Sequence, residues 1–131
     1  MHPVDLLDYL ESIATKLGEL GGVFSEEPAI EVDFNESIGI LRGQIAFAEG
    51  FRLNFDLVSA GPESFPDWLD YSFHMMDSRD VCVFRYDNAP HHPGFSNFPH
   101  HKHLGASESL QDCPRPSLDQ IMEEVRQIVY P

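Results

Sequence analysis

The stretch AIEVDFNESIGILRGQIAFAEGFRLNFDL, residues 29–57, decides the fold. Apolar and polar residues alternate over 30–35 and again over 51–57, and this period of two is typical of strands that bury one face. Residues 38–48 continue the pattern, although two glycines blur it. Because only short turns separate the three runs, we expect the strands to pair antiparallel.

Two more segments further along the chain have the composition of strands. They are WLDYSFHMM at 68–76 and VCVFRYD at 81–87, and both are rich in aromatic or β-branched residues. Between 51–57 and the first of them, GPESFP at 61–66 is expected to be a loop. Apolar residues at helical spacing precede and follow these strands, which predicts one helix on each side of them along the chain.

Helical spacing extends over 3–20 and over 118–129, and the second helix has a clear start because Ser117 and Gln120 form a capping-box pattern. The elements therefore follow in the order α-β-β-β-β-β-α. We predict an α+β fold, a single domain over 1–131 with an antiparallel sheet of about five strands, arranged as a meander plus a hairpin. The N-terminal and C-terminal helices would flank the sheet, cover one face and leave the other partly wet.

Net charge narrows the classes of function. The chain carries 8 basic and 22 acidic residues, a net charge of −14, whereas proteins that bind nucleic acid over a broad surface are usually basic. Residues 71–103 are the exception, with 3 basic residues, 3 acidic residues and six histidines. An anion would meet the least repulsion there, and the acidic remainder would attract a basic partner.

The sequence shows no pattern typical of a signal peptide, a membrane-spanning segment or a disulfide framework. Acids near the start stand where a signal peptide carries bases, and no apolar run approaches the length of about 18 residues that spans a membrane. Cys82 and Cys113 lie far apart and fit neither a disulfide framework nor a zinc-binding spacing. We expect a soluble, cytoplasmic protein without a cofactor, in which Cys82 is a small buried side chain.

Residues 88–116 show no periodicity and are rich in histidine and proline, so we expect a long loop within the domain. RYDNAPHHPGFSNFPHHKH, at 85–103, gathers five of the seven histidines of the chain. Arg85 and Asp87 share one side of the preceding strand because their spacing is two. Loops that leave a sheet commonly carry functional side chains, which makes this segment the candidate site.

Acid–base catalysis on a phosphodiester is the leading interpretation of the segment. Histidine can give or take a proton near neutral pH, and Arg85 or Lys102 could hold the phosphate. Asp87 could orient a histidine. The alternative is a solvated, inert loop in which Arg85 and Asp87 merely form an ion pair.

A metal site is a further interpretation. His101 and His103 would point the same way from an extended segment. An earlier histidine, His91 or His92, could complete such a site. The spacing matches no established zinc pattern, so we predict no metal. His74 lies in a strand beside two methionines, a setting more typical of a half-buried, hydrogen-bonded histidine than of a ligand.

Three motifs, YSFH (71–74), FRYDNAPHHP (84–93) and FPHHKHL (98–104), followed by an amphipathic C-terminal helix, resemble the TumE-type family of prokaryotic toxin–antitoxin proteins. The resemblance extends in layout over about 25–130 and is most specific at 68–104. It implies the toxin of a type II pair, which arrests growth when free and is silenced by a protein antitoxin. Such an antitoxin typically carries a helix-turn-helix domain.

The residues that the resemblance marks in this chain are His74, Arg85, Tyr86, Asp87, Asn88, His91, His92, His100, His101, Lys102 and His103. Many small toxins cleave RNA, and by that analogy we predict a metal-independent ribonuclease. From their chemistry we assign His101 and His103 as acid and base, with Arg85 and Lys102 as phosphate contacts.

The wider candidate set follows from the same motifs. Further catalytic candidates are Asp87, His91 and His92, and further substrate-binding candidates are Asn88, His74 and His100. Two alternatives stay open. The chain could be a non-enzymatic regulatory partner of a helix-turn-helix protein, or a metal-dependent hydrolase with histidine ligands.

Overall fold

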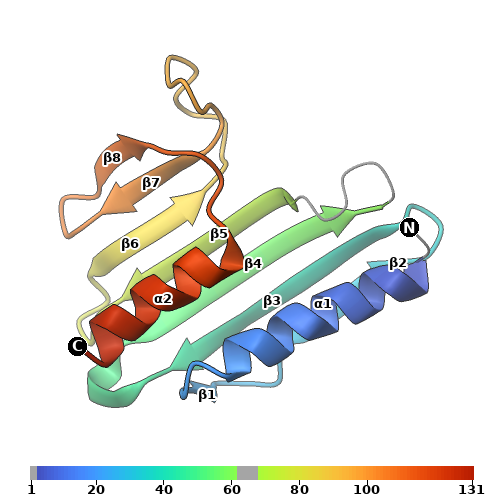
Figure 1. The fold of residues 1–131 in the computed structure, drawn as a ribbon, viewed down its shortest axis with the longest axis horizontal. Coiled ribbons are helices and arrows are strands. Elements are labelled where there is room, and N and C mark those ends of the chain that lie inside the picture. Colours follow the sequence, from blue (N-terminus) through green and yellow to red (C-terminus); the bar gives the residue numbers. More distant parts are fainter. Residues whose placement is uncertain (1–2, 62–67) are drawn as a thin grey trace.

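The computed structural model describes residues 3–61 and 68–131 (Figure 1). Its elements follow in the order α1 (Pro3–Gly18), β1 (Val23–Phe24), β2 (Ala29–Asp33), β3 (Ile38–Ala46), a short 3-10 helix (Ala48–Gly50), β4 (Arg52–Ala60), β5 (Trp68–Met76), β6 (Cys82–Asp87), β7 (His101–Leu104), β8 (Ser109–Asp112) and α2 (Leu118–Val129). The predicted α+β fold with a helix near each end is confirmed. Most of the loop predicted at 61–66 lies outside the described residues. Within the described ranges, no helix has the length and apolar character that crossing a membrane requires.

The described strands form one antiparallel sheet of eight strands, where the sequence predicted about five. They lie in the order β1-β3-β4-β5-β6-β7-β8, and β2 pairs with the same edge of β3 as β1 does. All five predicted strands are present, and the additional ones are β1, β7 and β8. From β3 onward neighbours in the sheet are also neighbours in the chain.

The hairpin of β7 and β8 corrects the prediction of an unbroken loop over 88–116. Hydrophobic alternation could not indicate it, because β7 (HKHL) carries polar side chains on both faces and β8 (SLQD) is exposed along its whole length. The hairpin forms because β6 offers it an edge: Phe84 to Asp87 pair with Leu104 to His101. These residues become strands because they pair with neighbouring strands, and not because apolar and polar residues alternate within them.

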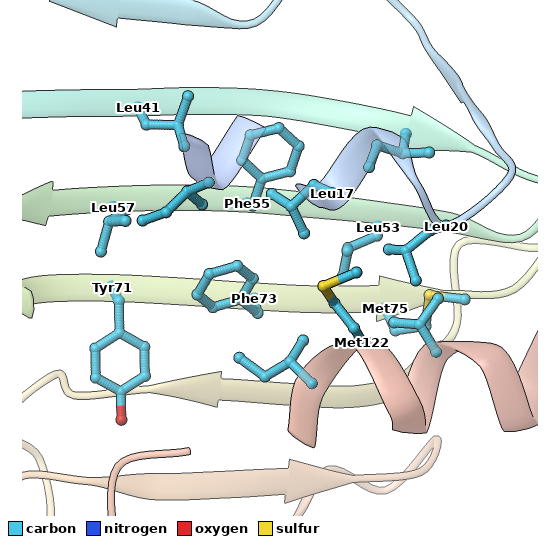
Figure 2. Close-up of a cluster of buried hydrophobic side chains, with 14 of the residues drawn as sticks. Leu17, Leu20, Leu41, Leu53, Phe55, Leu57, Tyr71, Phe73, Met75 and Met122 are labelled. Atoms are coloured by element: carbon cyan, nitrogen blue, oxygen red, sulfur yellow. The ribbon is translucent and has the colours of Figure 1, made fainter. Parts of the chain in front are cut away.

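Both helices lie on one face of the sheet (Figure 1), so the other face has no helical cover among the described residues. In the cross-strand register Leu41 faces Leu57 and Leu57 faces Tyr71, which gives the covered face an apolar surface. Figure 2 shows side chains of both helices converging on this surface. The principal buried residues are Leu10, Ile13, Leu17, Leu41, Ile45, Leu53, Phe55, Leu57, Trp68, Tyr71, Phe73, Met75, Phe84, Ile121, Met122 and Val125. Removing this area from water is the main stabilising contribution.

Specific contacts fix the ends of the helices on the sheet. The predicted capping box is confirmed: the Ser117 hydroxyl accepts from the Gln120 N–H, and the Gln120 side chain accepts from the Ser117 N–H. The N-terminal helix ends at Gly18, two residues earlier than predicted, yet Leu20 remains buried. Beyond α2, the Tyr130 hydroxyl donates to the Leu20 carbonyl at 3.0 Å and joins the two helical segments.

Gly43 provides a test of packing on the covered face. It lies opposite Phe55, and a Cβ at this position would lie 2.4 Å from the Phe55 ring. We expect Gly43→Ala to lower the free energy of unfolding by about 1–3 kcal/mol, as measured by urea denaturation, because the buried ring must shift.

Gly94→Ala is the matched control, because a Cβ there meets no atom within 4 Å. Its effect should stay within about 0.5 kcal/mol of the parent protein. Equal stability of the two variants would contradict the packing account.

Candidate active site

Residues of the sequence motif meet on the open face of the sheet, across β5, β6 and β7. Arg85 lies between His74 and His103 in the cross-strand register, and Asp87 pairs with His101. Because residues two apart on a strand share a face, these side chains all point away from the helices. We call Arg85, Asp87, His101 and His103 the Asp87 cluster.

Asp87 is buried at the centre of this cluster, and its side chain is 10% exposed. Its Oδ2 accepts from Arg85 Nε at 3.0 Å. Its Oδ1 accepts from the Ala89 N–H at 3.0 Å and lies 2.9 Å from Nε2 of His101. A carboxylate is costly to bury unless it is paired and hydrogen-bonded, and Asp87 is both.

His101 is held through both ring nitrogens. Nε2 faces the Asp87 carboxylate, and Nδ1 lies 2.9 Å from the carbonyl oxygen of Pro99. Both neighbours are acceptors, so an imidazolium that donates from each nitrogen satisfies both contacts. With 1% of the residue exposed, His101 is suited to fix the position and charge of Asp87 rather than to contact a ligand.

His103 has a different bonding pattern from His101. Its Nε2 lies 3.0 Å from Arg85 Nη2, which can only donate, so Nε2 accepts and the ring is neutral with its proton on Nδ1. Burial lowers the pKa of His103, and the adjacent Arg85 lowers it further, while Asp87 opposes the shift. The same Nε2 lies 3.4 Å from Oδ2 of Asp87. The lone pair on His103 Nε2 therefore accepts from the Arg85 guanidinium, and the Asp87 carboxylate lies next to the same nitrogen.

Arg85 is the most accessible member of the cluster, with 32% of its side chain exposed. Besides Asp87 and His103, it lies near Glu108, at 3.6 Å from Nη1 to the carboxylate. This longer contact is with a half-exposed side chain and is weak. An incoming anion could replace it at little cost.

His74 extends the line of side chains on the other side of Arg85. Its Nε2 is buried and has no hydrogen-bond partner among the described residues. The sequence favoured a hydrogen-bonded histidine here, and at this nitrogen the structure differs. Burial lowers the pKa of His74 and Arg85 lowers it further.

Lys102, predicted to bind substrate, lies away from the cluster. Lys102 points to the covered face, where its Nζ is 2.8 Å from Glu124 and 4.7 Å from the centre of the Tyr86 ring. Burial lowers the pKa of Lys102, but the hydrogen bonds with Glu124 and Tyr86 outweigh it and the net shift is upward. Arg85 and Lys102, predicted together as phosphate contacts, thus lie on opposite faces.

His100 and Asn88 have neighbours that tie them to β5. The Tyr71 hydroxyl lies 3.0 Å from His100 Nδ1, and the two rings stack. Burial raises the pKa of Tyr71, so the hydroxyl stays protonated and donates. The Asn88 side chain accepts from the Tyr71 N–H and donates to the Leu69 carbonyl, which continues the β5–β6 ladder.

The segment between β6 and β7 places the other two histidines differently. His92 packs edge-on against His101, at 5.2 Å between ring centres, and stacks on Phe95. His91 is exposed. Asp112 of β8 anchors the segment by accepting from the backbone N–H groups of Ser96 and Asn97. Sequence reasoning missed Asp112 because its role depends on the unpredicted strand β8.

Asp87, His101 and His103 also have the donor types of a metal site, and one candidate ligand atom from each lies within 4.8 Å of the others. In the structure these atoms already have partners, and Arg85 donates to two of the three side chains. A divalent transition metal bonds at about 2.0–2.2 Å and would have to displace the guanidinium. A metal bound here would therefore compete with Arg85 for these side chains.

Comparison with known proteins agrees with the motif pattern. A family model described as Toxin TumE matches residues 15–129. That range includes part of α1, every strand of the described residues and the whole Asp87 cluster. The resemblance found from the motifs is confirmed. No curated protein and no solved structure matches the chain.

Removing the central carboxylate tests the stability of the cluster. We expect Asp87→Ala to lower the free energy of unfolding by about 3–5 kcal/mol, because it leaves the buried His101 and the partly buried Arg85 without the carboxylate that they contact. Urea denaturation measures the change.

Asp56→Ala is the control for that experiment. Asp56 pairs with Arg42 at 3.1 Å on the same face, but 49% and 61% of the two side chains are exposed. Its loss should cost at most about 1 kcal/mol. If the two variants lost similar stability, the cluster would not be a buried electrostatic centre.

The bonding of His103 predicts its titration. Its imidazole should titrate below the ordinary value of about 6.5, and Arg85→Gln should move the midpoint upward, because a cation that opposes protonation is removed. NMR of the ring C–H signals against pH measures both midpoints. A downward shift in the variant would refute the contact between Arg85 and His103.

Proposed function

The chain belongs to the Toxin TumE family, and on that premise we propose that it acts in the cytoplasm as a type II toxin that arrests growth by cleaving RNA. The observation that carries this proposal is the neutral His103 hydrogen-bonded to Arg85 on the open face, with Asp87 behind both. These are an anion-binding group and a proton-transfer group in contact, as phosphodiester cleavage requires.

Arg85 is the proposed phosphate contact. Its guanidinium is partly exposed, and its fork of N–H donors suits two oxygens of a phosphate. A bound phosphate would compete with Glu108 and with His103 for these donors. The neutral charge balance of residues 71–103 favours an anion here, in a chain that elsewhere repels one.

His103 then becomes available for proton transfer. Once Arg85 turns toward the phosphate, His103 Nε2 loses its donor, and Asp87 at 3.4 Å stabilises the protonated ring. General acid–base groups of this kind contribute about 10²–10⁴-fold to rate. His101 has a supporting role, since it holds Asp87 in place. Lys102 takes no part because it lies on the other face.

A protein antitoxin is the partner that membership of a toxin family suggests. We propose that it carries a helix-turn-helix domain and that basic residues in it meet the acidic surface of this chain, whose net charge is −14. On this account antitoxin binding should weaken with rising salt.

Metal-dependent hydrolysis is the second candidate, favoured by the grouping of Asp87, His101 and His103. This candidate and the leading proposal differ in their sensitivity to a chelator, which is easily measured. Activity of a metal-dependent enzyme disappears with chelator, whereas histidine acid–base cleavage continues. A non-enzymatic regulator would bind its partner and cleave nothing.

Growth after induction in a bacterial host tests the toxin role and the site together. We expect the parent chain to arrest growth, and His103→Ala, at an equal soluble level, to permit it. Glu11→Ala is the control, because Glu11 is exposed on α1, across the sheet from the cluster. Arrest by all three chains would show that the cluster is not the source of toxicity.

Cleavage of purified RNA tests the chemistry. The parent chain should cleave in the presence of EDTA, and His103→Ala should lose about 10²–10⁴-fold in kcat/KM. Loss of activity with EDTA and its return with added Zn²⁺ or Mn²⁺ would instead support the metal-dependent candidate. Growth arrest without any cleavage would reject the ribonuclease proposal and leave the toxin role standing.

A further inference from the structure

Two histidines flank Arg85 in a straight line across three strands. His74 on β5 and His103 on β7 are its direct neighbours in the register, one on each side. Neighbouring side chains across strands lie about 5 Å apart at Cβ, so the two histidines are about 10 Å apart with the guanidinium between them. A phosphate bound by Arg85 would therefore have an imidazole on either side.

His74 has a nitrogen that the protein does not use. Its Nε2 is buried and without a hydrogen-bond partner among the described residues. Buried polar atoms nearly always have a hydrogen-bond partner, and leaving one without a partner is costly. His101, by contrast, has both nitrogens engaged. Of these two histidines, only His74 therefore has a free ring nitrogen for a group bound at Arg85.

We propose that His74 is the catalytic base and His103 the catalytic acid in the RNA cleavage proposed above, on either side of a phosphate bound by Arg85. This inference rests on the proposed function and assigns a proton-transfer role to a residue that the motifs had suggested only as a substrate contact. It replaces the pairing of His101 with His103, because both ring nitrogens of His101 are already engaged by Asp87 and by the Pro99 carbonyl.

Neighbouring charges decide which histidine is the base. His103 has the Asp87 carboxylate at 3.4 Å, which stabilises its protonated ring once Arg85 binds phosphate. His74 faces Arg85 on β6 and the uncharged Asn54 on β4, and the acids that act on it, Asp87 and Glu108, have weaker effects than Arg85. His74 is therefore the ring that stays neutral and accepts a proton.

The reaction balances with these two groups. His74 Nε2 takes the proton of a ribose 2′-hydroxyl, and the 2′-oxygen forms a bond to phosphorus. The bond from phosphorus to the 5′-oxygen breaks, and that oxygen takes the proton of the His103 imidazolium. The products are a 2′,3′-cyclic phosphate and a 5′-hydroxyl. The substrate class is RNA, because DNA lacks the 2′-hydroxyl nucleophile.

An oligoribonucleotide with sulfur in place of one bridging 5′-oxygen separates the two roles. A thiolate leaves without a proton, so the acid becomes dispensable and the base does not. On the normal RNA we expect both His74→Ala and His103→Ala to lose about 10²–10⁴-fold in kcat/KM. On the sulfur-bridged RNA, His103→Ala should come within about 10-fold of the parent chain, while His74→Ala should remain impaired.

Two further variants guard against a loss of folding. His74→Gln keeps a polar side chain but cannot take a proton, so it should match His74→Ala on both substrates. Glu11→Ala should match the parent chain, because Glu11 is exposed on α1, across the sheet from the cluster. Circular dichroism and a thermal melt confirm that each variant is folded.

The outcomes separate the two proposals. Rescue of His74→Ala by the sulfur substrate would make His74 the acid and overturn the assignment. Parent-like cleavage of normal RNA by folded His74→Gln would also overturn it, while the proposed function would stand. If the parent chain cleaved neither substrate, the proposed function would fail and the assignment with it.

Discussion

The antiparallel pairing of β3 through β8, with register shifts only at Val58/Ser59 and Met75/Met76 in the β4–β5 and β5–β6 pairs, is the constraint on which the rest of the structure depends. Because alternate side chains point to opposite faces, the register assigns each residue either to the helices or to the open face. Leu57, Phe73 and Phe84 go to the covered face and build the core. Arg85 and Asp87, from the same strand as Phe84, go to the open face. A shift of one residue in β6 would bury the charges and expose the core.

The buried charge of Asp87 is the second requirement that the fold must meet. Arg85, His101 and the Ala89 N–H supply its partners, and they come from β6, β7 and the segment between them. The segment therefore cannot move far without leaving the carboxylate unpaired. This explains why a polar hairpin with little apolar area to bury is held at the end of the sheet.

Histidines of one sequence segment have different states because their neighbours differ. His101 lies between two acceptors, and His103 accepts from a guanidinium. His100 turns to the covered face and meets a tyrosine. His91 is exposed. The chemistry proposed for this chain follows from these environments. It does not follow from the number of histidines in residues 85–103, although that number is the most noticeable feature of the sequence.

The sequence by itself determined the helices, the strands β2 to β6 and the cap at Ser117, because local spacing of apolar residues reports directly on local structure. It also placed Arg85 and Asp87 on one side. Tertiary structure alone decided that 101–104 and 109–112 are strands, since 101–104 extend along the edge of β6 and 109–112 along the edge of β7. That pairing also sent Lys102 to the covered face and brought His101 and His103 to Asp87. The spacing of residues along the chain shows which side chains share a face of a helix or strand. It does not show which other elements that face contacts, because those elements come from distant parts of the sequence.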